Sequence, residues 1–375
     1  MPVTVAAVGE NTPGERRSAI TPEIVKKLRA AGVRVVLPPG YGASTWYTAA
    51  DFGDVEWRDD AITDADVVLC VRPPDEAALR RMKPGALLIG MLQPHGGDAG
   101  IRAMADGKLG SFSLELLPRT TRAQAMDVLS SQAGVTGYKA VLIAAERAPK
   151  FFPMLTTAAG TIRPSKVLIV GAGVAGLQAI ATAKRLGAQV EGFDVRPETR
   201  EQIESLGAKF LDLGVSAAGS GGYARELTAE EREQQQKALA DHLKGIDVVV
   251  TTAAVPGRKA PRIISAAMIA GMKPGAVIVD IAAESGGNTE LSKPGETVVT
   301  DNGVSVIGTV NLPATTPIHA SEMYARNLYN FLELSLADGV LTLDWEDELI
   351  AKTCLTHAGQ IKHEPTQQAI EGASS

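Results

Sequence analysis

Residues 166–196 read KVLIVGAGVAGLQAIATAKRLGAQVEGFDVR and contain an apolar run, three glycines, an alanine-rich stretch and a second apolar run. The β-branched run 166–170 predicts a buried strand, and the alanine-rich stretch that ends near Gly187 predicts a helix. A second strand is expected over 189–193, and Asp194 follows it directly. This order is typical of a βαβ unit in a doubly wound α/β domain.

The glycines at 171, 173 and 176 have the G-x-G-x-x-G spacing of a dinucleotide-binding turn. Gly171 permits a tight turn, Gly173 lets the backbone approach a pyrophosphate, and Gly176 lets the helix pack closely on the strand. The start of the helix offers free N–H groups to the phosphates. The alternative is a glycine-rich turn that merely joins strand to helix. The candidate cofactor-binding residues are Gly171, Ala172, Gly173, Val174, Ala175, Gly176, Asp194, Val195, Arg196 and Ala253.

Asp194 lies about 20 residues beyond the glycines, where a carboxylate accepts hydrogen bonds from an adenosine ribose. A carboxylate there would repel a 2′-phosphate, which favours NAD over NADP. Arg196 weakens this inference, because an arginine can hold such a phosphate.

The bulk composition is that of a soluble α/β protein. The chain has 375 residues with 45% hydrophobic and 21% charged content, which suggests two domains or one large one. The net charge of −6 and the absence of a basic cluster make nucleic-acid binding a poor hypothesis. Cys70 and Cys354 lie in apolar contexts, so we expect buried thiols in a reducing compartment. Neither a secretory signal nor a membrane-spanning run is recognisable.

Alternating strand and helix patterns over residues 3–116 predict a largely parallel sheet with helices on both faces. The second half repeats the pattern: the stretch MKPGALLIGMLQ, ending at Gln93, is matched by MKPGAVIVDIAAE, ending at Glu284. We therefore expect two Rossmann-like doubly wound domains linked by long helices, with a discontinuous first domain. The expected bounds are 1–128 with 312–375, and 129–311.

The connecting segments carry three further expectations. Residues 122–148 predict a long helix that is broken or bent near Gly134 and Gly137. After Val310, helical periodicity predicts a helix that packs on the first domain, and its apolar face is Tyr324, Leu328, Phe331, Leu332 and Leu336. The last dozen residues are polar and small, which predicts a frayed tail.

A long glycine-rich loop is expected over residues 214–236. Tyr223 is its single aromatic residue, so we interpret the loop as a lid over the cofactor and count Tyr223 among the cofactor-binding candidates. The alternative is a disordered insertion without a role.

Nearly all of residues 1–360 resembles the alanine dehydrogenase and transhydrogenase superfamily. The shared motifs are GERRSAITP at 14–22, VRPP at 71–74, GAGVAG at 171–176, AVPGRKAP at 254–261 and VDIAAESGGN at 279–288. Within the superfamily, the chain is most similar to the NAD(H)-binding component (domain I, the α or α1 subunit) of proton-translocating NAD(P) transhydrogenases.

The stretch LPRTTRAQAMDVLSSQ at 117–132 carries this closer resemblance. It is similar to the transhydrogenase loop that surrounds the nicotinamide, and the matching positions are Arg119, Gln124, Asp127 and Ser130. The resemblance implies that the arginine and aspartate fix the carboxamide and that the amide bridges to the second nucleotide. A surface salt bridge between Arg119 and Asp127 is the alternative.

Departures from alanine dehydrogenase concern its acid/base residues. Gln93 stands where that enzyme has a histidine, Arg72 where it has a lysine, and Glu284 where it has an aspartate. An amide and a guanidinium do not exchange protons near neutral pH. The substrate-binding arginine persists as Arg17, and the nearby His95 is a possible substitute for the histidine.

The resemblance implies a chain that binds NAD(H) and passes hydride to NADP held by a partner. The implied partners are the NADP(H)-binding β subunit (domain III) and the membrane-spanning domain II, and the chain is expected to be a homodimer. It would work on the cytoplasmic side of a bacterial membrane, attached through its partners. No metal site is expected. The alternatives are an NAD-dependent alanine or other amino-acid dehydrogenase and a non-catalytic NAD-sensing module.

Overall fold

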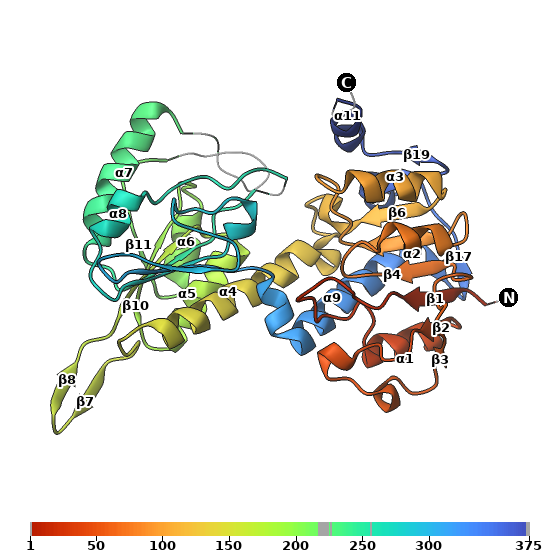
Figure 1. Cartoon of the computed structure of the whole chain (residues 1–375), viewed down its shortest axis with the longest axis horizontal. Coiled ribbons are helices and arrows are strands. Elements are labelled where there is room, and N and C mark those ends of the chain that lie inside the picture. Colours follow the sequence, from red (N-terminus) through yellow and green to blue (C-terminus); the bar gives the residue numbers. More distant parts are fainter. Residues whose placement is uncertain (1, 217–224, 226, 256, 373–375) are drawn as a thin grey trace. The chain divides into compact units, whose positions relative to one another are not determined.

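The computed structural model describes residues 2–216, 225, 227–255 and 257–372. The chain splits into two compact units, unit 1 (Met1–Gln132 with Pro313–Ser375) and unit 2 (Ala133–Leu312). Helix α4 (Val128–Arg147) runs from unit 1 into unit 2 (Figure 1). The chain passes from unit 2 back to unit 1 within the short 3-10 helix η6 (Leu312–Thr315), just before α9 (Pro317–Leu332) begins.

Unit 1 contains an eight-stranded sheet of order β19-β18-β6-β5-β4-β1-β2-β3. Strands β1 to β6 pair in parallel, whereas β18 and β19 form an antiparallel edge. The strands are β1 (Thr4–Ala7), β2 (Arg34–Leu37), β3 (Glu56–Trp57), β4 (Val67–Leu69), β5 (Leu87–Gly90), β6 (Gly110–Ser113), β18 (Cys354–His357) and β19 (Gln360–Ile361).

Helices bury both faces of this sheet. Alternate residues of a strand point to opposite faces, so Val67 and Leu69 join one hydrophobic cluster and Val68 joins the other. Helices α1 (Pro22–Ala30) and α9 (Pro317–Leu332) cover the first face, together with α10 (Glu348–Thr353). Helices α2 (Glu76–Arg81), α3 (Asp98–Asp106) and α11 (Glu364–Gly372) cover the second. A small hairpin, β16 (Leu336–Ala337) with β17 (Val340–Leu341), follows α9.

Unit 2 repeats this architecture with the order β11-β10-β9-β12-β13-β15-β14. All pairs are parallel except that of β14 with β15. The strands are β9 (Lys166–Val170), β10 (Gln189–Phe193), β11 (Lys209–Phe210), β12 (Val248–Thr251), β13 (Val277–Asp280), β14 (Thr297–Val299) and β15 (Ser305–Gly308). A separate hairpin, β7 (Leu155–Thr157) with β8 (Gly160–Ile162), extends from the body of the unit (Figure 1).

The helices of unit 2 also cover both faces of its sheet. Buried residues of α4, α5 (Val174–Arg185) and α6 (Thr199–Ser205) pack on one face. Those of α7 (Ala229–Leu243) and α8 (Ala266–Ala270) pack on the other. The expected doubly wound α/β fold is therefore confirmed for both halves. The order β3-β2-β1-β4-β5 in unit 1 corresponds to β11-β10-β9-β12-β13 in unit 2.

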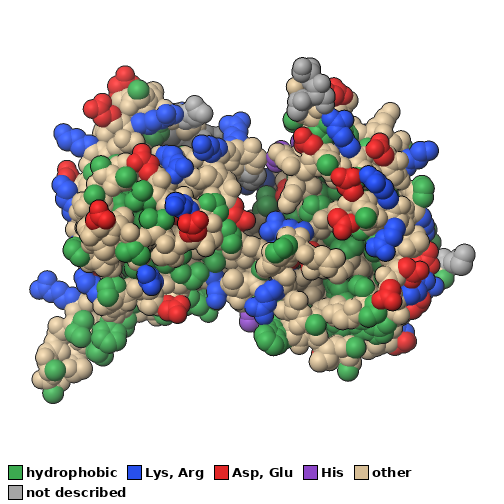
Figure 2. Space-filling view, viewed as in Figure 1, with side chains coloured by type: hydrophobic (Ala, Val, Ile, Leu, Met, Phe, Trp, Pro, Cys, Tyr) green, Lys and Arg blue, Asp and Glu red, His purple; other side chains and the backbone are tan. Residues whose placement is uncertain are grey.

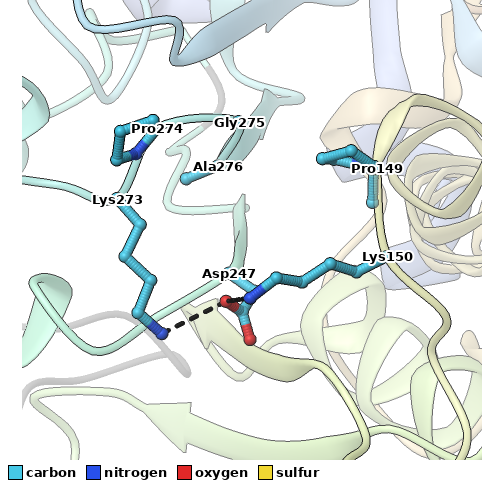
Figure 3. A pocket seen from close by; sticks show the side chains of 8 residues that line it. Pro149, Lys150, Asp247, Lys273, Pro274, Gly275 and Ala276 are labelled. Carbon is cyan, nitrogen blue, oxygen red and sulfur yellow. Dashed lines mark hydrogen bonds and ion pairs between the residues drawn. The ribbon is translucent and has the colours of Figure 1, made fainter. Parts of the chain in front are cut away.

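At the amino ends of the unit 2 strands, Asp247 links three segments. Its carboxylate accepts hydrogen bonds from Lys150 Nζ at 2.7 Å and from Lys273 Nζ at 3.2 Å (Figure 3). It also accepts one from the backbone N–H of Lys166 at 2.9 Å. The adjoining cavity is about 10 Å³, too small for an organic ligand, and it lies opposite the sheet edge at which nucleotides bind, so this cluster is structural.

Helix α4 corrects the expected break near Gly134 and Gly137, because it is continuous over Val128–Arg147. The space around Gly137 gives the reason for its glycine. A Cβ there would lie 2.0 Å from the carbonyl oxygen of Ala175 in α5. This glycine allows α4 and α5 to pack closely and does not break the helix.

Two segments expected to lack structure are helical. Helix α7 begins inside the expected 214–236 loop, and Thr228 with Glu231 forms a capping box at its start. Helix α11 replaces the expected frayed tail, because Thr366 and Ile370 are buried. Tyr223 lies outside the described residues.

The expected apolar face of α9 is confirmed for Tyr324, Leu328, Phe331 and Leu332, which are buried in the core of unit 1. Leu336 is also buried but belongs to β16, since the helix ends at Leu332. Both cysteines are free, buried thiols, as expected. Among the described residues, no helix combines the length and the apolar character needed to span a membrane.

Candidate nucleotide site

The turn between β9 and α5 has the geometry that its glycines predict. Gly171 has a φ of +97°, a left-handed conformation that favours glycine. A Cβ on Gly176 would lie 1.8 Å from the carbonyl oxygen of Gly171, so helix and turn touch directly. A Cβ on Gly173 would meet no atom within 4 Å, which leaves open space beside the backbone.

The open space at Gly173 lies at the start of a helix. Gly173 is the N-cap residue of the 12-residue helix α5, and no acidic residue occurs in the first turn of this fully described helix. The N–H groups of that turn and the positive end of the helix dipole favour a negatively charged group. The turn therefore fits the phosphates of a dinucleotide.

Asp194 directly follows β10 beside this turn, and its carboxylate is already fully hydrogen-bonded. One oxygen, Oδ2, accepts from the backbone N–H of Ala172 at 2.7 Å and from Arg196 Nη2 at 2.7 Å. The other, Oδ1, accepts from the backbone N–H and from Nε of Arg196, both at 2.9 Å. The side chains are 7% and 16% exposed, so the pair is largely buried.

Ala253 follows β12 at the same edge of the sheet and is held by Asn288. The amide of Asn288 accepts from the N–H of Ala253 at 3.0 Å and donates to the carbonyl oxygen of Ala253 at 2.7 Å. Asn288 is fully buried and also donates to Pro261. The main chain of Ala253, near the glycine turn, is therefore held through both its N–H and its C=O group.

A buried carboxylate organises the loop that carries Asn288. Asp280, at the end of β13, accepts from the backbone N–H groups of Ala282, Asn288 and Thr289 and from the hydroxyl of Ser292. Sequence reasoning missed both Asp280 and Asn288. The available signal was an aspartate that directly follows an apolar strand, as Asp194 does.

In unit 1, the structure brings together two of the four predicted loop residues. Asp127 accepts from the backbone N–H of Ser130 at 2.9 Å and from its hydroxyl at 2.5 Å. Asp127 thus caps the start of α4. Arg119 and Gln124 are exposed on the same loop.

The loop that carries Gln124 is anchored to the core of unit 1 and to helix α9. Its neighbours Ala123 and Met126 are buried in the core of unit 1. Asn327 and Asn330 of α9 both donate to the carbonyl oxygen of Ala125, at 2.8 and 2.9 Å. Gln124 is therefore an exposed side chain on a rigid support.

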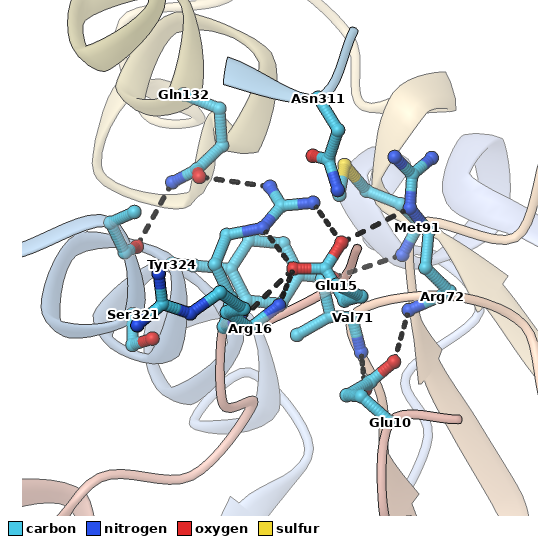
Figure 4. A network of polar contacts seen from close by, with 12 residues as sticks. Glu10, Glu15, Arg16, Val71, Arg72, Met91, Gln132, Asn311, Ser321 and Tyr324 are labelled. Atoms are coloured by element: carbon cyan, nitrogen blue, oxygen red, sulfur yellow. Dashed lines mark hydrogen bonds and ion pairs between the residues drawn. The ribbon is translucent and has the colours of Figure 1, made fainter. Parts of the chain in front are cut away.

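A buried polar network occupies the carboxyl ends of the unit 1 strands (Figure 4). Glu15 accepts from Nε and Nη2 of Arg17 at 2.8 and 2.7 Å, and from Nε of Arg72 at 3.3 Å. Arg17 Nη1 donates to Gln132 at 3.0 Å. Each nitrogen of the Arg17 guanidinium therefore has a protein partner, and Arg17 and the Glu15 side chain are almost completely buried.

A second buried carboxyl, that of Glu10, lies beside this network. Glu10 accepts from the backbone N–H groups of Val71 and Arg72, and burial raises the pKa of its carboxyl to about 7. Gln93 is exposed after β5, and its backbone N–H donates to the carboxylate of Glu115 at 3.0 Å. His95 faces His363, with ring centroids 6.1 Å apart. Among the described residues, no group of three or more metal-ligating side chains is placed to hold a metal ion.

Comparison with known proteins places both halves in one family. The models described as "Alanine dehydrogenase/PNT, N-terminal domain" and "Alanine dehydrogenase/PNT, C-terminal domain" match residues 6–136 and 140–364. The first part of NAD(P) transhydrogenase subunit alpha of Rhodospirillum rubrum is 42% identical over 377 residues, covering 96% of this chain and 97% of the relative. Alanine dehydrogenase of Mycobacterium tuberculosis is 28% identical over 377 residues, covering 95% and 93%.

Among solved structures, the transhydrogenase from Sinorhizobium meliloti superposes with a TM-score of 0.85 at 39% identity, covering 96% of this chain and 99% of that one. The similarity to transhydrogenase thus extends over nearly the whole length of both chains.

Two alanine substitutions in the glycine turn separate ligand binding from folding. Gly173→Ala should weaken NADH binding by about tenfold or more, because a methyl group enters the phosphate space, while thermal stability stays unchanged. Gly176→Ala should lower the free energy of unfolding by about 1–3 kcal/mol or more, because its Cβ meets a backbone oxygen. Fluorescence titration and thermal denaturation measure the two effects.

Gly134→Ala is the matched control, since it adds a methyl group to open space in helix α4. It should leave NADH affinity unchanged. Wild-type NADH affinity in the Gly173→Ala protein would contradict the assignment of the phosphate site.

Proposed function

The chain belongs to the alanine dehydrogenase/PNT family, and we propose that it is the NAD(H)-binding subunit of a proton-translocating NAD(P) transhydrogenase. The observation that carries the proposal is 42% identity over nearly the full length of a relative named as the first part of an NAD(P) transhydrogenase alpha subunit. The glycine turn of unit 2, with open space at Gly173, fits the cofactor NAD(H).

When bound, NADH would supply a hydride to the nicotinamide of NADP⁺ held by a partner subunit. Two electrons and one proton move together, so no side chain has to accept or donate a proton. The residues of this chain bind and orient the ring. We assign that role to Arg119, Asp127 and Ser130, and the bridge to the second nucleotide to Gln124, because their loop matches the transhydrogenase motif.

The buried network of unit 1 favours this function over amino-acid dehydrogenation. A dehydrogenase needs an arginine to bind the substrate carboxylate, and Glu15 and Gln132 already occupy three of the five N–H donors of Arg17. It also needs an acid/base group, and Gln93 carries an amide. His95, the possible substitute for the missing histidine, instead has its ring against that of His363, in the segment before α11.

The same proposal defines the partners and the location. The relatives are named as one subunit of an enzyme, so this chain is proposed to act with an NADP(H)-binding β subunit (domain III) and a membrane-spanning domain II. It would be attached to the inner face of the membrane through these partners and be active only with them.

We also propose that the chain forms a homodimer through the β7–β8 hairpin. Every residue of both strands is exposed, although the hairpin and its base carry large apolar side chains (Figure 2). Phe151, Met154, Leu155 and Ile162 are 54%, 64%, 39% and 45% exposed. An isolated two-stranded hairpin is marginally stable in water, so a second copy of the chain would stabilise it by covering these side chains.

Gln124→Asn tests the division between binding and transfer. Shortening the amide by one methylene should leave the dissociation constant of NADH within about twofold, because the nucleotide cradle lies elsewhere in the sequence. It should slow hydride transfer to an NADP-loaded partner by about tenfold or more, because small misplacements of reacting groups are costly. Gln368→Asn on the exposed face of α11 makes the same chemical change as a control. An equal loss of NADH binding in Gln124→Asn would contradict the assigned role.

Met154→Asp tests the hairpin as a dimer contact. A buried, unpaired carboxylate should weaken self-association by at least about tenfold, as measured by sedimentation equilibrium. Val299→Asp, at an exposed apolar position on the edge strand β14, should leave association unchanged. A monomeric wild-type protein, or an unaltered Met154→Asp dimer, would argue against this interface.

A further inference from the structure

The carboxylate of Asp194 has no acceptor position left for a ligand. A carboxylate offers about four lone-pair positions. Here two are used by Arg196 through Nε and Nη2, and two by the backbone N–H groups of Ala172 and Arg196. The two hydroxyls of an adenosine ribose can therefore bind this carboxylate only if existing donors leave.

The guanidinium of Arg196 is the donor group that can leave. The two backbone donors belong to the glycine turn and to the chain that follows β10, so their removal would require refolding. The Arg196 side chain, by contrast, is 16% exposed and ends in a planar fork that can rotate towards solvent. The exchange would trade two charge-assisted hydrogen bonds from the guanidinium for two from the ribose hydroxyls.

We propose that Arg196 is a specificity-determining residue that competes with the adenosine ribose for Asp194. The inference rests on the proposed function, because it takes the ligand to be NAD(H). In the ligand-free protein the guanidinium fills the ribose acceptor positions and neutralises the carboxylate. Arg196 thereby lowers the affinity for NADH and weakens the repulsion of a 2′-phosphate.

The pair also changes the charge that a nucleotide meets. A lone carboxylate at the end of β10 would repel a 2′-phosphate, whereas a bidentate Asp194–Arg196 pair has no net charge. A displaced guanidinium would remain on the same loop, where it can accept a phosphate in its fork. Selectivity for NADH over NADPH is thus smaller than the aspartate alone would give.

Arg196→Met tests the competition, because methionine keeps an unbranched apolar stem and removes the fork. We expect NADH to bind about threefold to tenfold more tightly and NADPH to bind more weakly, since two acceptor positions become free and the carboxylate loses its counter-charge. The control is Arg200→Met. Arg200 lies on α6, pairs with Asp212 at 2.7 Å, and its removal deletes one positive charge nearby without touching Asp194.

A second measurement isolates the ribose hydroxyl. The affinities of AMP and 2′-deoxy-AMP should be similar in the wild type, because the 2′-hydroxyl gains a hydrogen bond to Asp194 only when the guanidinium of Arg196 loses one. In Arg196→Met, AMP should bind about tenfold more tightly than 2′-deoxy-AMP, because a hydrogen bond to a charged group contributes about that much. Arg196→Lys, which keeps the charge but offers a single ammonium, should give an intermediate ratio.

The outcomes are distinguishable. Weaker NADH binding in Arg196→Met, with an unchanged ratio between AMP and 2′-deoxy-AMP, would show a supporting contact and overturn the competition. Equal changes of NADH affinity in Arg196→Met and Arg200→Met would show that only the loss of a positive charge matters, which would also overturn the competition. Failure of the wild type to bind NADH at all would instead refute the proposed function, and this inference with it. Thermal unfolding of each variant confirms that the comparison is made on folded protein.

Discussion

Strand β9 is hydrogen-bonded to β10 along one edge and to β12 along the other, and the chain leaves the carboxyl ends of these strands in different directions. In open parallel sheets the divergence of connections at such a point leaves room for a ligand. The glycine turn, Asp194 and Ala253 follow these three strands in turn. Their meeting at one sheet edge is thus a consequence of strand order, although they are far apart in the sequence.

Buried polar side chains convert this edge into a rigid support. Asp280 orders the loop that carries Asn288, and Asn288 holds the main chain of Ala253 on both its polar groups. The first five strands of unit 1 have the same order, but at the carboxyl ends of its strands Arg17 and Arg72 both donate to Glu15. Burying such charges is tolerable only because each finds several partners. The same type of fold therefore carries the proposed nucleotide site in unit 2 and a buried polar network in unit 1.

Local rules suffice to predict the βαβ unit, the glycine geometry and the buried face of α9, because each depends on spacing within a short window. They fail where tertiary contacts decide. Gly137 predicts a bend from its sequence alone, whereas its role depends on the carbonyl oxygen of Ala175 in another helix. The C-terminal segment is polar enough to predict a frayed tail, but the burial of Thr366 and Ile370 suffices to dock a helix.

Site prediction shows the same limit. Asp194 is identifiable from its position after a strand, but nothing in the spacing reveals that Arg196 fills its acceptor positions. Asp280 and Asn288 escape sequence reasoning because they act on backbone groups brought close only by the fold. The motif 117–132 points to Asp127 as a nicotinamide contact, and the structure adds that it caps α4 through Ser130. Asp127 thus has a local structural role in addition to its proposed role in binding the ligand.

The central claim is that this chain binds NADH but transfers its hydride only to a nucleotide held by a partner. The most direct measurement is NADH oxidation by the purified chain, first with pyruvate and ammonia and then with an NADP-loaded transhydrogenase partner, alongside an NADH titration. The account predicts saturable binding, no turnover with pyruvate and ammonia, and oxidation once the partner is added. Steady turnover with pyruvate and ammonia alone would contradict it and identify an amino-acid dehydrogenase.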